Sequence, residues 1–293
     1  MISFHLFAPH WCTSTAATSS NITPNEQRKP FVFNIDQLPI WGIFLAIVVI
    51  LLIAVEIGFR LGLWLQKRRP ESKDSRMTNT VAGGMLGLMA FLMAFSIGIV
   101  INQHNSRKEM VVTEANAIGT AWLRAGFFDE ADAAAARELL REYTQIRLDA
   151  ADAGDSTLIE SVLVRSEEIH NELWAIMEKN VKAGNDSDIM ALVAESFNDV
   201  IDVHTLRWTA VNLRLPRMLG TMLVLATILS FLLIGVASSA DGKRDTLAMI
   251  LFTVAYVAVL IIIIDLNRPQ QGVINVSQTA MADLLRTITP SGQ

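Results

Sequence analysis

TVAGGMLGLMAFLMAFSIGIVI, residues 80–101, and the polar stretch that follows it, NQHNSRKEMVVTEANAIGTAWLRAGFF, residues 102–128, decide the fold of this chain. The first part is apolar and, at about 1.5 Å per residue, long enough to cross a membrane core of roughly 30 Å. No proline or turn cluster separates the two parts. We therefore predict one long helix that joins a membrane bundle to a helical domain outside the membrane.

Four apolar runs have the length that a membrane-spanning helix needs: residues 39–65, 80–101, 216–238 and 246–265. The composition agrees, with 52% hydrophobic residues and a mean hydropathy of +0.38. The expected fold class is an all-α integral membrane protein with four transmembrane helices and a helical bundle inserted between spans two and three.

The chain divides into five predicted segments. They are a disordered N-terminal tail (1–38), the first two spans with a basic linker (39–101), the extramembrane bundle (102–215), the last two spans (216–265) and a C-terminal tail (266–293).

Two features at the segment ends leave room for alternatives. The last helix of the bundle is expected to continue past Pro216 into the third span, with a kink at the proline. An amphipathic turn at Met281, Leu284 and Leu285 could lie on the membrane or on the bundle.

Basic residues in the short loops predict the orientation. The linker QKRRPESKDSR, residues 66–76, carries five Lys or Arg residues beside two membrane ends, and the turn SADGKRD, residues 239–245, carries two more. Such loops remain cytoplasmic. We therefore expect a multi-pass protein of the plasma (inner) membrane, with residues 102–215 outside the cytoplasm.

Two stripes of side chains follow the helix at residues 80–101. Small residues that let another helix approach closely recur on one side, at Gly83, Gly87, Ala90, Ala94 and Gly98. Turned from them lie Leu88, Phe91, Phe95 and Ile99. In a symmetric oligomer, Phe91, Phe95 and Ile99 could form a hydrophobic constriction that gates by dewetting. The alternative is that these three side chains only pack against lipid or other helices.

Polar residues follow where the helix leaves the membrane. Asn102, Gln103 and His104 would form a polar vestibule, and Glu114 and Asn116 would fix contacts between the long helices or between subunits. His204 and Arg207 are interpreted as helix-packing or interfacial groups. Within the first span, Glu56 and Arg60 lie on one helix face, which favours a structural ion pair over a functional site.

The sequence lacks the motifs of common catalytic and metal sites. The five histidines show no HExxH spacing, Cys12 is the only cysteine, and no Walker A, GxSxG or dinucleotide fingerprint is present. We therefore expect no enzymatic activity, no cofactor, no metal site and no nucleic-acid partner.

Three stretches resemble the "bestrophin-like domain" family of bacterial membrane proteins: EANAIGTAWLRAGFF (114–128), AAARELLREYTQIRL (134–148) and DLNRPQQGVINVSQ (265–278). The last contains the charges Asp265 and Arg268. Bestrophins are pentameric anion channels whose second membrane helix lines a hydrophobic neck, and residues 91–103 are similar to that helix. The chain lacks a counterpart of the Asp-rich calcium clasp. The family also implies a cytosolic helical domain, whereas the basic loops place it outside.

The leading hypothesis is a homo-oligomeric ion channel or channel-like pore, with membrane lipids and inorganic ions as partners. The alternative is a non-conducting sensor or scaffold that binds a partner through the extramembrane bundle. A transporter ranks last, because the sequence shows neither inverted repeats nor a pair of broken spans.

Overall fold

The computed structural model describes residues 39–68, 75–153, 156–185, 187–240, 246–268 and 272–289. The tail predicted at residues 1–38, with Cys12, lies outside these ranges, as do residues 69–74 of the basic linker. All regular secondary structure within the described ranges is helical, which confirms the all-α prediction.

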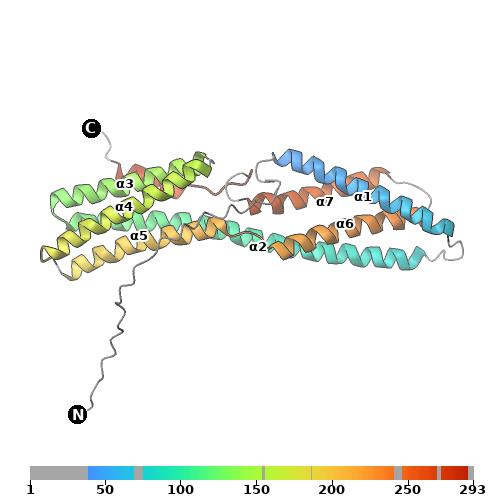
Figure 1. Ribbon diagram of the computed structural model, residues 1–293, viewed down its shortest axis with the longest axis horizontal. Coiled ribbons are helices and arrows are strands. Elements are labelled where there is room, and N and C mark those ends of the chain that lie inside the picture. Colours follow the sequence, from blue (N-terminus) through green and yellow to red (C-terminus); the bar gives the residue numbers. More distant parts are fainter. Residues whose placement is uncertain are drawn as a thin grey trace, which may run out of the picture. The chain divides into compact units, whose positions relative to one another are not determined.

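The helices follow one another as shown in Figure 1. They are α1 (Ile40–Arg68), α2 (Ser75–Arg124), the short 3-10 helix η2 (Ala125–Phe127), α3 (Glu130–Ala153), α4 (Ser156–Lys182), α5 (Asp188–Asn212), α6 (Arg217–Ala240), α7 (Thr246–Asn267) and α8 (Thr279–Ile288).

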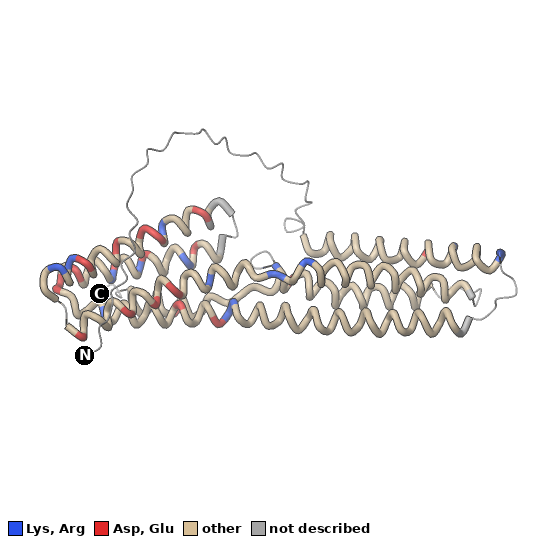
Figure 2. Tube along the Cα trace, turned by 60° about the horizontal axis from the view of Figure 1, so that its bottom comes forward, with Lys and Arg blue, Asp and Glu red and all other residues tan. Residues whose placement is uncertain are grey.

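Four helical stretches in the described chain are long and apolar enough to cross a membrane, and they contain α1, α2, α6 and α7. In Figure 2 the charged residues gather on the part of the molecule formed by α3, α4, α5 and the second half of α2. The fold is therefore an integral membrane protein with a charged helical bundle inserted between the second and third spans.

Helix α2 is a single helix of 50 residues, which confirms the predicted rod. Buried positions recur every seven residues along it. One series is Ala82, Met89 and Ser96, and a second is Val100, Arg107, Glu114 and Ala121. Seven residues make nearly two helical turns, so these side chains lie on one side of the helix. This side packs on α5, α6 and α7.

Helices α5 and α6 do not form one continuous helix. Residues 213–216 between them are non-helical, so the prediction of a single helix kinked at Pro216 is wrong. A proline disfavours helical geometry at the residue before it and offers no N–H group of its own. Neighbouring elements supply hydrogen bonds to the linker instead: Arg107 donates to the Leu213 oxygen at 2.6 Å, and the Leu215 nitrogen donates to Asn267 Oδ1 at 2.7 Å.

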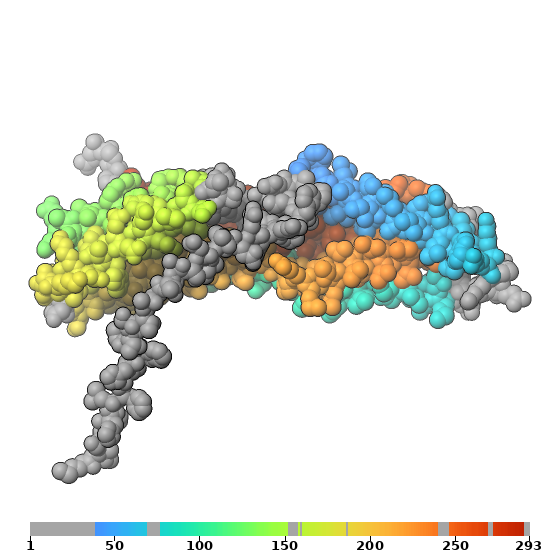
Figure 3. Space-filling view, viewed as in Figure 1, coloured from blue at the N-terminus to red at the C-terminus, as the bar shows by residue number. Residues whose placement is uncertain are grey.

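Helices α1 and α6 pack backbone to backbone in the membrane part, and Figure 3 shows them on one face, α1 in blue and α6 in orange. Gly58 and Gly62 of α1 meet Gly235 and Ser239 of α6. A Cβ atom on Gly235 would lie 2.2 Å from the Val55 carbonyl oxygen. Small residues at such a contact let membrane helices approach closely without the hydrophobic driving force that operates in water.

The core of the bundle is formed by fully buried apolar and aromatic side chains, among them Ile118, Leu140, Ile169 and Phe197. Met281 of α8 is completely buried in the same core, and α8 contacts α2 and α3. The C-terminal amphipathic segment therefore packs on the bundle, which decides between the two predicted locations.

We predict that Gly235→Ala destabilises the membrane part, because the added Cβ meets a backbone oxygen that no side-chain rotation can move. Overpacking of this kind costs about 1–3 kcal/mol, which should lower the melting temperature of the protein in detergent. Gly220→Ala is the matched control on the same helix, since its nearest contact is Leu215 Cδ2 at 3.9 Å. Equal melting temperatures for the two variants would contradict the assigned contact.

Candidate functional site

The side of α2 opposite its buried positions is apolar and exposed within the membrane part. Phe91 and Phe95 are 67% and 54% exposed, Leu88 is also exposed, and Ile99 is half-buried. These aromatic side chains do not contribute to the core of the chain's own membrane bundle. That Phe91, Phe95 and Ile99 form a constriction remains a prediction.

The stripe of small residues shares this exposed side. Gly83, Gly87, Ala90, Ala94 and Gly98 are all exposed. A Cβ atom on Gly83, Gly87 or Gly98 would meet no atom of the described chain within 4 Å beyond the adjacent backbone of α2 itself. Close helix packing inside the chain uses Gly58 and Gly235 instead. A packing role for the stripe therefore concerns a partner other than the described helices of the same chain.

The candidate vestibule residues lie on α2 just beyond the membrane part. Asn102 is exposed, whereas Gln103 and His104 are half-buried. The Gln103 Oε1 atom is buried without a hydrogen-bond partner among the described residues. Asn116, further along the helix, is exposed. The exposed positions of Asn102 and Asn116 continue the side that carries Phe91 and Phe95.

Glu114 lies on the buried side of α2, in the centre of the bundle, and its side chain is completely buried. Tyr143 of α3 donates a hydrogen bond to Glu114 Oε1 at 2.6 Å, and Arg207 of α5 donates to Oε2. The Nε atom of Arg147 lies 3.2 Å from Oε1. Glu114 thus contacts α3 through Tyr143 and α5 through Arg207.

Two histidines complete this buried charge cluster. The Nδ1 atom of His204 lies 2.9 Å from the Tyr143 hydroxyl. Because Tyr143 gives its only hydrogen to Glu114, His204 Nδ1 carries a hydrogen and donates it to the Tyr143 oxygen. The ring of His170 stands edge-on to that of His204, with 5.0 Å between the centroids, and its Nε2 atom is buried without a hydrogen-bond partner among the described residues.

The surroundings set the charge of each group in the cluster. Burial alone would raise the pKa of Glu114, but the charges of Arg147 and Arg207 and the Tyr143 hydrogen bond hold this pKa below its usual value. Burial, reinforced by the Glu114 carboxylate, raises the pKa of Tyr143 well above 10. At neutral pH the cluster therefore contains a carboxylate, a neutral phenol and two guanidinium groups.

Burial also keeps both histidines neutral. It lowers the pKa of His170 to about 4, while the charges of Glu114 and Arg147 act in opposite directions. For His204, burial followed by the positive charge of Arg147 lowers the pKa to about 4 as well.

The residues that the structure describes place no group of three or more His, Cys, Asp or Glu side chains where they could hold a metal ion.

Arg107 joins the membrane part to the bundle. Its buried guanidinium donates hydrogen bonds to the carbonyl oxygens of Ala210 at 3.2 Å, Leu213 at 2.6 Å and Leu266 at 3.0 Å. These carbonyls lie at the C-terminal ends of α5 and α7, where a positive charge is favourable. One side chain of α2 thus caps two helices that end at the boundary of the membrane part.

The charges of the last sequence motif lie at the same boundary. Asp265, which is buried, accepts hydrogen bonds from the backbone nitrogens of Val273 and Ile274, both at 2.9 Å. Gly272 lies close to its carboxylate, where a Cβ atom would come within 2.6 Å of Oδ1. Arg268 is buried as well. Asp265 therefore anchors the segment that leads from α7 to α8.

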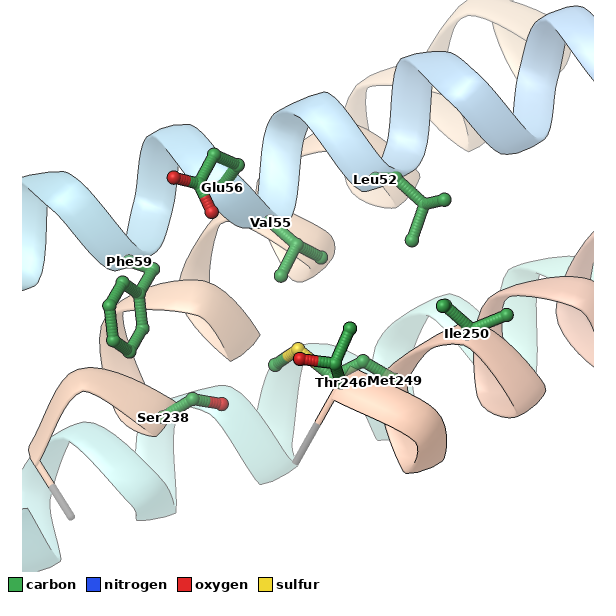
Figure 4. A pocket seen from close by; sticks show the side chains of 8 residues that line it. All are labelled: Leu52, Val55, Glu56, Phe59, Ser238, Thr246, Met249 and Ile250. Atoms are coloured by element: carbon green, nitrogen blue, oxygen red, sulfur yellow. The ribbon is translucent and has the colours of Figure 1, made fainter. Parts of the chain in front are cut away.

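A hollow of about 220 Å³ lies among the membrane helices. Figure 4 shows Glu56 and Phe59 of α1, Ser238 of α6, and Thr246 and Met249 of α7 around it. Arg60 Nε donates a hydrogen bond to Glu56 Oε1 at 2.8 Å, which confirms the predicted ion pair. The charge of Glu56 is therefore neutralised on its own helix.

The fold and the site define a four-span helical membrane protein whose second span continues into an inserted bundle. The chain matches the Bestrophin-like domain family over residues 42–281 and belongs to this family, as its sequence motifs indicate.

Among solved structures, the chain is similar to two crystal structures of a bacterial bestrophin homolog from Klebsiella pneumoniae. One, a single-residue variant, gives a TM-score of 0.60 at 13% identity, covering 85% of this chain and 97% of that chain. The other, phased on zinc, gives 0.51 at 15% identity, covering 85% and 96%. At such identities the likeness shows the fold alone. The comparison with curated proteins finds no match.

Sequence reasoning identified Glu114, His204 and Arg207 separately and missed that they meet. It did not single out Tyr143, Arg147, His170 or Arg107. One signal was available, since Arg107 and Glu114 are seven residues apart and share a side with the apolar Val100. A charged residue in register with an apolar side of a helix indicates a buried, paired charge.

We predict that stability falls as the pH decreases from about 6.5 to about 4. The folded pKa of His170 and His204 is about 4, below the ordinary value of 6.5, so the unfolded chain binds more protons in this window. His170→Gln, which cannot titrate, should make the melting temperature less dependent on pH between these values. The control is His104→Gln, which lies outside the cluster and should keep the pH dependence of the wild type. If the melting temperature of the His170 variant changed with pH as steeply as that of the wild type, the prediction would be contradicted.

Proposed function

We propose that the protein forms an oligomeric, channel-type membrane pore, in which α2 lines the pore and Phe91, Phe95 and Ile99 form a hydrophobic constriction. The observation that carries this proposal is the exposed apolar side of α2, with two aromatic side chains more than half exposed. Membership of the Bestrophin-like domain family supports a channel-type function.

The arrangement of side chains supports a ring of identical subunits. Gly83, Gly87 and Gly98 leave the α2 backbone open on its exposed side. In a closed ring every copy makes the same two contacts with its neighbours, so a neighbouring helix can approach each copy along this stripe. Phe91 and Phe95, turned from the stripe, can then point to the central axis. A ring of such apolar side chains opposes the passage of water and ions until it widens.

Polar residues continue the exposed side of α2 beyond the constriction, beginning with Asn102. We assign Asn102, Gln103 and His104 to a vestibule, and membrane lipids and inorganic ions to the partners. From the basic loops, which include Lys67, Arg68, Lys243 and Arg244, we place the bundle outside the cytoplasm in a plasma (inner) membrane.

A non-conducting sensor or scaffold is the second candidate, and one observation favours it. Apolar side chains are exposed at the end of the bundle remote from the membrane part, where α2 and α5 pack: Leu123, Phe127, Ile189 and Leu192. Exposed apolar residues of this kind often mark protein interaction surfaces.

We expect Phe91→Ala combined with Phe95→Ala to raise or deregulate conductance in a planar bilayer, because the truncation widens the constriction. The oligomeric state should be measured first, by mass photometry in nanodiscs, and should be a ring of several subunits. Leu225→Ala combined with Leu229→Ala, on the exposed side of α6, is the matched control and should leave conductance unchanged. A correctly assembled double phenylalanine variant without conductance would count against the pore.

Single cysteines introduced at position 91 or 95 in a Cys12→Ser background should react with a water-soluble thiol reagent, since pore-facing positions meet water. A cysteine at exposed Leu225 should remain unlabelled in lipid. A cysteine at exposed Asn116 reports the orientation, and an impermeant reagent applied to intact cells should label it. Equal protection at positions 91, 95 and 225 would favour the scaffold.

A further inference from the structure

A small cavity lies between α3, α4 and α5, beside the buried charge cluster. Its volume is about 40 Å³. Arg147 and Arg207 line it together with apolar and aromatic side chains: Ala150, Ala151, Val162, Leu163, Trp208 and Val211. No carboxylate of the described chain belongs to this lining.

The charges around this cavity do not balance. Glu114 is the only buried carboxylate that the structure describes in the bundle, and both Arg147 and Arg207 pair with it. His170 and His204 are neutral, as derived above. The other acidic side chains that the structure describes on these helices are at least partly exposed, and two of them pair elsewhere: Glu142 binds Arg165, and Asp149 binds Gln145. Among the described side chains, one positive charge is left in excess.

Arg147 carries this excess. Its side chain is only 10% exposed, and its contacts in the described chain are the Glu114 carboxylate at 3.2 Å and the face of the Tyr143 ring at 6.0 Å. Its buried Nε atom, although 3.2 Å from Glu114 Oε1, is not aligned for a hydrogen bond with it. Arg207, by contrast, donates to both Glu114 and Gln278. A largely buried guanidinium that shares its one carboxylate partner with a second guanidinium is costly unless a further anion balances the charge.

We propose that this cavity binds one small inorganic anion of the halide class, held between Arg147 and Arg207. The small volume of the cavity, about 40 Å³, favours a monatomic anion over a larger oxyanion. The bound anion accepts hydrogen bonds from Arg147 and balances the excess positive charge of the cluster. This site lies in the bundle, outside the constriction on α2, and does not depend on whether the protein conducts ions.

The test is thermal unfolding of the full-length protein in detergent at constant sodium concentration, with chloride exchanged for gluconate. Chloride should raise the melting temperature saturably, by about 5 °C once its concentration is far above the dissociation constant. Sulfate in place of chloride should not raise the melting temperature in this way. In Arg147→Gln the chloride response should disappear, and in gluconate this variant should be at least as stable as wild type. Arg165→Gln, at a partly exposed arginine on α4 outside the cavity, is the matched control and should keep the response.

A second variant keeps both arginines and fills the cavity. Ala151→Leu should occupy the cavity volume and abolish the chloride response. In crystals soaked in bromide, an anomalous peak should lie between Arg147 and Arg207 in the wild type but not in this variant. Equal melting temperatures in chloride and gluconate would overturn the proposal. So would a chloride response that persists in Arg147→Gln or in Ala151→Leu.

Discussion

The hydrogen bonds of Arg107 hold the two parts of this protein together. One guanidinium on α2 satisfies carbonyl oxygens at the ends of α5 and α7 and in the linker before Pro216. Without it, the carbonyl oxygens of Leu213 and Leu266 would lose a charged donor at the boundary of the membrane part, where unsatisfied backbone groups are costly. The break between α5 and α6 is possible because α2 supplies these bonds, so the course of the chain out of the membrane depends on this contact.

The two sides of α2 explain how one helix can belong to both parts. Its buried side carries Arg107 at the boundary and Glu114 two turns further on, and both are matched by groups of other helices. Its exposed side carries Phe91, Phe95 and then Asn102. A displacement of α2 along its axis would shift the buried charges and the exposed aromatic residues together. The proposed pore-lining side and the bundle-anchoring side are therefore mechanically linked in this helix.

Small residues serve two different purposes in the membrane part, although the sequence pattern looks the same. Gly58 and Gly235 lie where the backbones of α1 and α6 meet, and neither tolerates a Cβ atom without movement. Gly83 and Gly87 stand four residues apart, as Gly58 and Gly62 do, yet a Cβ atom on either would meet nothing within 4 Å beyond the adjacent backbone of its own helix. The first pair holds the subunit together, whereas the second pair is open to a surface outside it.

The sequence by itself determined the four spans, the continuous rod of α2 and the family, because apolar run length and local motifs are properties of neighbouring residues. Only the tertiary structure decided which glycines pack within the chain, where α8 binds, and that Glu114, Tyr143, Arg147 and His204 form one cluster. These facts depend on contacts between residues far apart in the sequence. Helical periodicity gives the side of a helix on which a residue lies, but not the helix that it meets.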